Sequence, residues 1–112
     1  MSQPVLVKVY GGFRPATREF HDALASALPG AIPAEHIGLE LDGEMCVLSF
    51  EGVYFPLEEV LAAISRHAGR DASGRLDYLD LENWRLVRHE LAAGELSRHE
   101  ADLNHVLDYS GF

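Results

Sequence analysis

The segment Gly11-Gly12-Phe13-Arg14 has the composition of a small anion site. It follows a β-branched apolar run over 5–10 and precedes a helical pattern, so we expect a loop that leads into a helix N-terminus. Glycines let a ligand approach the backbone, unpaired N–H groups at a helix start attract negative charge, and Arg14 offers a fork for a carboxylate or phosphate. The simpler interpretation, which we favour, is a sharp turn with a solvated arginine, since no Walker or G-x-G-x-x-G motif is present.

A second candidate is the acidic cluster Asp77, Asp80 and Glu82. If these residues lie in a strand, Asp80 and Glu82 point to the same face. Two neighbouring carboxylates can separate their pKa values and share acid–base work. The simpler interpretation, again favoured, is that Asp80 caps the next element and the other two side chains face water.

A third candidate is a metal site in the tail, with His99, Asp102 and His105 as its ligands. On a helix, Glu95, His99 and Asp102 would share one face, and imidazole and carboxylate groups suit zinc, iron or nickel. However, residues 97–100 have the pattern of a capping box, which would start the helix after Ser97 and take Glu95 off that face. The histidines have no H-x-x-x-H or H-E-x-x-H spacing, so we favour solvent-exposed side chains and expect no cofactor.

The elements that must position these residues begin with a hairpin at Asp42-Gly43. Asp-Gly suits the two positive-φ positions of a type I′ turn, which sets Leu41 opposite Glu44 and Leu39 opposite Cys46. The apolar face of this hairpin is then Ile37, Leu39, Leu41, Cys46, Leu48 and Phe50. We expect Cys46 to be a buried core residue and not a nucleophile.

Two amphipathic helices flank the hairpin in sequence. One apolar stripe runs through Ala16, Phe20, Ala23, Leu24, Ala27 and Leu28, and the other, after Pro56, through Leu57, Val60, Leu61 and Ile64. With strands over 5–10 and 75–81, the order is β-α-β-β-α-β. This order predicts an α+β fold, a ferredoxin-like sandwich with two helices on one face of a four-stranded antiparallel sheet. Residues 1–81 form this core, and 82–112 form an extension of the same single domain.

The extension has two interpretations. As strands, 84–91 pairs with 95–102 through Ala92-Ala93-Gly94, which suits a hairpin loop. As helices, an apolar stripe over 81–91 is followed by a second helix over 98–108. We favour the helix over 98–108 and leave 84–91 open. The apolar character of 106–112 also predicts that the end of the chain docks on the domain.

Composition limits the function. The chain of 112 residues has a net charge of −9 and a single lysine, Lys8, which argues against binding to nucleic acid or to an anionic membrane. No apolar run is long enough for a membrane helix. A single cysteine excludes an internal disulfide and fits a cytoplasmic location.

These observations favour a cytoplasmic binding, assembly or regulatory module without its own catalysis. A homodimer is expected, because small sandwiches of this order pair edge strands or sheet faces, and a protein partner is a further prediction. The alternatives are a small dimeric enzyme or metal-binding protein that uses the tail histidines and carboxylates, and an anion-sensing domain that uses Gly11, Gly12 and Arg14.

Overall fold

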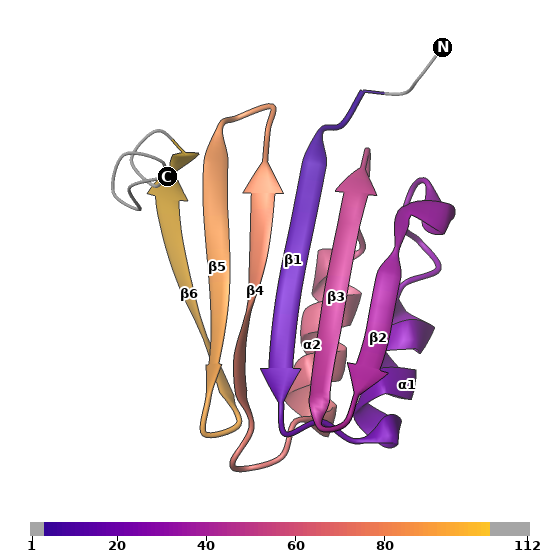
Figure 1. Ribbon diagram of the computed structural model, residues 1–112. Helices are drawn as coiled ribbons and strands as arrows, with labels where there is room; N and C mark the ends of the chain where they lie inside the picture. The colour runs from indigo at the N-terminus through magenta and orange to yellow at the C-terminus, as the bar shows by residue number, and fades with distance from the viewer. Residues whose placement is uncertain (1–3, 104–112) are drawn as a thin grey trace.

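The computed structural model describes residues 4–103, which form one antiparallel sheet with two helices packed on a single face (Figure 1). The strand order across the six-stranded sheet is β2-β3-β1-β4-β5-β6. The predicted α+β class is therefore confirmed. In chain order the elements are β1 (Val7–Arg14), α1 (Arg18–Ala27), the 3₁₀ turn η1 (Ala34–His36), β2 (Gly38–Asp42), β3 (Met45–Gly52), α2 (Leu57–His67), β4 (Ser73–Asp80), β5 (Arg85–Ala92) and β6 (Glu95–Asp102).

The main core lies between the sheet and the two helices. Strict alternation in β3 buries every second residue against the helices and exposes the others. Burial of each large apolar side chain contributes roughly 1.5–3 kcal/mol. The predicted stripes supply this core: Phe20 and Leu24 from α1, Val60 and Ile64 from α2, and Cys46, Leu48 and Phe50 from β3. Burial also raises the pKa of the Cys46 thiol.

The β2–β3 hairpin has the predicted faces but not the predicted register. Asp42 pairs with Met45, so the turn residues are Gly43 and Glu44. Gly43 has a φ of 61°, whereas Asp42 and Glu44 do not have positive φ. A positive φ at the first turn residue alone is the pattern of a type II′ turn, not of the expected type I′. Leu41 consequently lies opposite Cys46 and not opposite Glu44.

The expectation of a loop at residues 11–14 is wrong, because β1 continues to Arg14. Gly11 and Gly12 pair with β3 on one side and with β4 on the other. Ladder hydrogen bonds on both sides outweigh the weak strand propensity of glycine. Helix α1 starts later, where the side chain of Thr17 accepts a hydrogen bond of 3.1 Å from the N–H of Phe20.

The extension is a hairpin that adds two strands to the expected four. The favoured helix over 98–108 is wrong for residues 98–102, which lie in β6. The hairpin turn has positive φ at both Ala93 and Gly94, 52° and 77°, as a type I′ turn requires. The free edge of β4 offers β5 a hydrogen-bonding partner. Leu103, the last described residue, has helical geometry and is buried. His105, the rest of the predicted helix after Leu103 and the expected docking of 106–112 lie outside the described residues.

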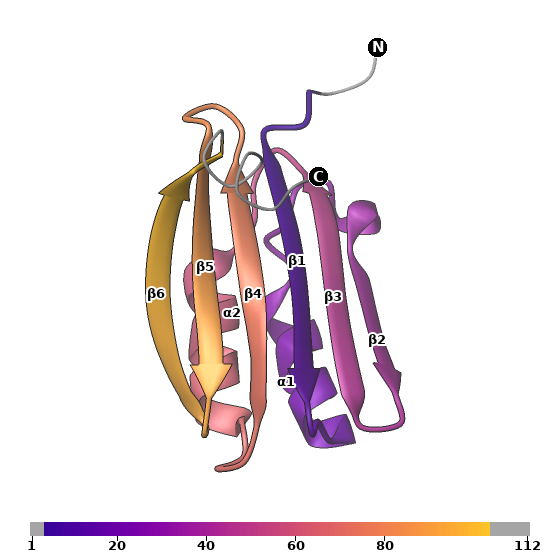
Figure 2. The ribbon, with the colours of Figure 1, turned by 60° about the vertical axis from the view of Figure 1, so that its left-hand side comes forward.

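The opposite side of the sheet carries no helix in the described part of the chain (Figure 2). We call this side the open face. Alternation assigns to it one residue in two from each strand, among them Tyr10, Met45, Val47, Asp77 and Arg88. Neither helix of residues 4–103 is long and apolar enough to cross a membrane.

Candidate functional site

A hollow of about 450 Å³ lies on the open face, over the neighbouring strands β3, β1, β4 and β5. We call it the Gly12 hollow. It exists because Gly12 has no side chain between its cross-strand neighbours Val47 and Arg75. A Cβ atom at Gly12 would meet only the Cε of Met45, at 2.8 Å. The lining residues are Tyr10, Gly11, Gly12, Met45, Gly74, Arg75, Asp77 and Glu90.

The hollow joins parts of two sites that were predicted separately. Gly11 and Gly12 come from the predicted anion segment, and Asp77 comes from the acidic cluster. The other members of the anion segment do not take part. Phe13 is buried in the core, where its ring lies 5.7 Å from that of Phe20, and Arg14 is exposed at the end of β1.

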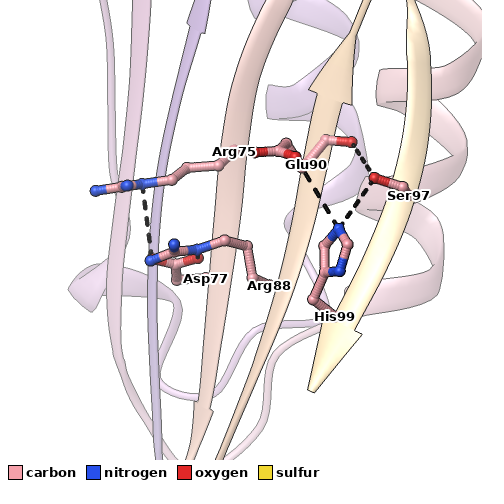
Figure 3. A network of polar contacts seen from close by, with 6 residues as sticks. All are labelled: Arg75, Asp77, Arg88, Glu90, Ser97 and His99. Carbon is pink, nitrogen blue, oxygen red and sulfur yellow. Dashed lines mark hydrogen bonds and ion pairs between the residues drawn. The ribbon is translucent and has the colours of Figure 1, made fainter. Parts of the chain in front are cut away.

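Asp77 is held by a bidentate ion pair with Arg88 from the next strand (Figure 3). Arg88 donates from Nε to Oδ1 at 2.8 Å and from Nη2 to Oδ2 at 3.0 Å. Arg75 approaches the same carboxylate at 3.7 Å. The hydrogen bond to Asp77 is the main cause that raises the pKa of Arg88. Because both carboxylate oxygens are engaged, Asp77 is poorly suited to act as a general base.

The acidic cluster does not converge. Asp80 ends β4, and its carboxylate accepts hydrogen bonds from the backbone N–H groups of Glu82 and Asn83, both at 3.1 Å. The side-chain amide of Asn83 donates a third, at 2.8 Å. Asp80 thus caps the turn after β4, as the simpler interpretation expects. That interpretation does not hold for Asp77, whose side chain is paired with Arg88 and only 14% exposed. Glu82 lies in that turn and not in a strand, so the expected pair of carboxylates on one strand face is absent from the described structure.

One wall of the hollow is the ring of Tyr10, which is 43% exposed. Its hydroxyl donates a hydrogen bond of 3.1 Å to Glu51, whose carboxylate also lies 3.5 Å from the Lys8 ammonium. Partial burial, and then the hydrogen bond and charge of Glu51, raise the pKa of Tyr10. The phenol therefore stays protonated and anchored at neutral pH.

Ser97, His99 and Glu90 lie together beside the hollow and superficially resemble a catalytic triad (Figure 3). The Ser97 hydroxyl lies 3.4 Å from the Nε2 atom of His99, and the Glu90 carboxylate lies 4.0 Å from that same nitrogen. A working triad needs the base to contact the serine through one ring nitrogen and the carboxylate through the other. This arrangement is therefore a surface contact network and not a nucleophilic site.

The predicted metal ligands are not gathered by the described residues. Glu95 and His99 lie on one face of β6 and Asp102 on the other, because strand side chains alternate, so the helical face that would have joined them does not form. Within residues 4–103, no group of three His, Cys, Asp or Glu side chains is placed to hold a metal ion. His105 lies outside these residues.

Sequence reasoning missed most of the rim and walls of the hollow. Tyr10, Met45, Arg75 and Glu90 come from four strands, and their proximity depends on the pairing of β4 with both β1 and β5. One local signal was available: Arg75 and Asp77 are two residues apart in one strand, as are Arg88 and Glu90 in the next. Such spacing puts opposite charges on one face of a sheet.

No family model, no curated protein and no solved structure matches the chain. Function is therefore inferred from the geometry and charge of the Gly12 hollow.

Proposed function

We propose that the chain is a non-catalytic binding module whose Gly12 hollow takes a small zwitterion with an apolar side chain, the class of the free amino acids. One observation carries the proposal. A hollow floored by glycine backbone has an acid and a base, Glu90 and Arg75, as direct cross-strand neighbours at its rim.

The charges at the rim support a zwitterion over a simple anion or cation. Asp77 and Arg88 neutralise each other through their bidentate pair. Arg75 is left with a contact of only 3.7 Å to Asp77, and its side chain is 62% exposed. The carboxylate of Glu90 lies 4.0 Å from the Nε2 atom of His99. Arg75 is thus available to a carboxylate and Glu90 to an ammonium group.

The floor and walls support an apolar side chain between these charges. Gly12 lets a ligand approach the strand backbone, which any larger residue would cover. The Tyr10 ring and the Met45 thioether supply apolar and polarisable contact at the sides. Because the rim charges are exposed and the hollow is open to solvent, we expect affinity in the millimolar range.

The test is a titration of ¹⁵N-labelled protein with L-leucine, followed by the backbone amide signals of Gly11, Gly12 and Gly74. We expect saturable shifts at these glycines. Isocaproate, which lacks the ammonium group, and isopentylamine, which lacks the carboxylate, are expected to bind more weakly than leucine. Equal shifts with all three compounds would show that the rim charges select nothing, and the absence of saturable shifts at the glycines would refute the site.

Two variants alter the hollow, and a third makes the same arginine-to-glutamine change elsewhere as a control. Gly12→Val fills the hollow, and Arg75→Gln removes its cation. Both are expected to abolish the leucine-dependent shifts. Arg18→Gln, which removes an exposed arginine from α1 on the helix side, is expected to leave them unchanged.

The predicted homodimer and protein partner are part of this proposal, as is a cytoplasmic location. The core from β1 to β4 is further proposed to be a ferredoxin-like unit, supported by the order β2-β3-β1-β4 within the sheet. The complete sheet differs from that fold because β5 and β6 extend it. Edge strands motivate the dimer, since a sheet with unpaired edges is a template for pairing.

A further inference from the structure

We propose that two copies of the chain associate edge to edge through β6, in the antiparallel register that sets His99 opposite His99 of the second copy. This inference rests on the homodimer proposed above and names its surface. In that register Arg98 of each copy lies opposite Glu100 of the other.

β6 is the more available of the two sheet edges. It is the last strand in the order, pairs only with β5 in the described structure, and runs for eight residues, most of them exposed (Figure 1). An edge of this length presents alternate backbone N–H and C=O groups that have no strand partner. It contains no proline, and its register with β5 is continuous, without a bulge to bend it away.

The other edge, β2, is poorly suited to self-association. It has five residues, and its charged side chains, Glu40 and Asp42, are both acidic. A symmetric pairing of β2 with itself centred on Glu40 or on Leu41 would set these carboxylates opposite one another, which destabilises a sheet. β6 differs because it carries both signs of charge, with Arg98 and Glu100 two residues apart.

Symmetry limits the registers that β6 can adopt with itself. Two copies that pair antiparallel and continue the sheet are related by a two-fold axis perpendicular to it. The axis lies between the two β6 strands, level with one residue, which is then opposite its own copy. The open faces of both copies lie on the same side of the joined sheet. An axis at Arg98 sets arginine against arginine, and an axis at Glu100 sets glutamate against glutamate.

An axis at His99 avoids both conflicts. It sets Arg98 of each copy opposite Glu100 of the other. The two resulting pairs lie on one face of the joined sheet. Within one copy these side chains already form a pair of 3.1 Å between Nη2 and Oε1, so their charged ends reach the same region of the strand. An axis at Ser97 sets Arg98 opposite Leu96 and forgoes the Arg98–Glu100 pairs. Charge complementarity therefore selects the His99-centred register.

The experiment measures the dimer dissociation constant by sedimentation equilibrium and light scattering over a micromolar concentration series. Variants are Arg98→Glu, Glu100→Arg and the double exchange. Arg18→Glu on α1, with the same charge change as Arg98→Glu, is the control. Each single edge variant turns two attractive pairs into two repulsive ones, so we expect the dissociation constant to rise about tenfold or more. The double exchange is expected to restore dimerisation, and Arg18→Glu to leave it unchanged.

The outcomes distinguish the dimer from its surface. A monomer throughout the concentration series would overturn both the proposed homodimer and this interface. A dimer that is insensitive to both single variants would leave the homodimer in place and overturn the β6 interface. Weakening by the single variants without restoration in the double exchange would overturn the His99-centred register. None of these outcomes bears on leucine binding at the Gly12 hollow, which is measured separately.

Discussion

Replacement of His89 by leucine is expected to stabilise the protein and to flatten its pH dependence. His89 is 6% exposed and lies in β5 on the helix side of the sheet, between the cross-strand neighbours Leu76 and Arg98. Its Nε2 atom makes no hydrogen bond within the described residues. A buried polar atom of this kind loses its hydration on folding without compensation.

The size of the effect follows from that missing hydrogen bond. An unsatisfied buried donor or acceptor costs about 1–3 kcal/mol, and leucine has a comparable volume without polar atoms. Allowing for imperfect packing of the new side chain, we expect His89→Leu to add about 1 kcal/mol to the free energy of unfolding. In a chain of this length that corresponds to an increase of about 4 °C in Tm.

The pH dependence has a definite sign. Burial, and then the charge of Arg98, lower the pKa of His89 from 6.5, while Asp77 acts in the opposite direction. The unfolded chain therefore binds a proton at His89 more readily than the folded protein does. The stability associated with neutral His89 is complete above the unfolded pKa and is lost as pH falls through 6.5 toward the lowered folded value. Each pKa unit between the two states corresponds to about 1.4 kcal/mol.

The assay is urea unfolding of the wild type and of His89→Leu, followed by the fluorescence of Trp84 and by far-UV circular dichroism. Measurements on both sides of the histidine range, near pH 5.5 and pH 7.5, isolate His89 because the other titrating groups are common to both proteins. His67→Gln, at an exposed position of α2, is the control. A variant that is less stable at both pH values and keeps the wild-type pH difference would refute the reasoning.

Two further predictions concern the residues around the hollow. Gly74→Ala should destabilise the protein by about 3 kcal/mol or more, because its Cβ would overlap the carbonyl of Gly12 and lie 2.8 Å from the Cα of Phe13, at a φ of 152°. Gly12→Ala should change stability by less than about 1 kcal/mol; similar losses for the two variants in urea unfolding would contradict this. A double-mutant cycle with Asp77→Ala and Arg88→Ala should give a coupling of about 1 kcal/mol that decreases with added salt. A coupling near zero at low salt would mean that the pair adds no stability.

Much of the core could be predicted from sequence because it depends on local periodicity. The apolar stripes of both helices and the buried side of β3 were identified from spacing alone. The hairpin illustrates why such predictions tolerate error. The turn lies at 43–44 and not at 42–43, so each residue of β2 pairs with a β3 residue two positions later than predicted. Since side chains alternate with a period of two, Leu39, Leu41 and Cys46 stay on the core side.

Residues 11–14 and 98–102 were assigned incorrectly for a common reason. The glycines of the first segment and the capping-box pattern near the second are local signals. Both segments are strands because they form hydrogen bonds with neighbouring strands. Gly12 is paired by Val47 and Arg75, which lie more than thirty residues away. β6 depends on β5, and β5 depends on the free edge of β4. Hydrogen bonds to neighbouring strands of the sheet outweigh the intrinsic conformational preference of individual residues.

The candidate site shows the same division. Local sequence determined that Gly11 and Gly12 leave room for a ligand to approach the backbone. It also determined that Asp77 is an acidic residue within a strand and that Cys46 belongs to the core. Only the tertiary structure decided that the glycines and Asp77 line one hollow, that Arg88 binds the carboxylate of Asp77, and that Arg75 and Glu90 lie opposite each other at the rim. The physical reason is that a sheet face is assembled across strands, so its neighbours are set by pairing order and register, which periodicity along a single segment does not encode.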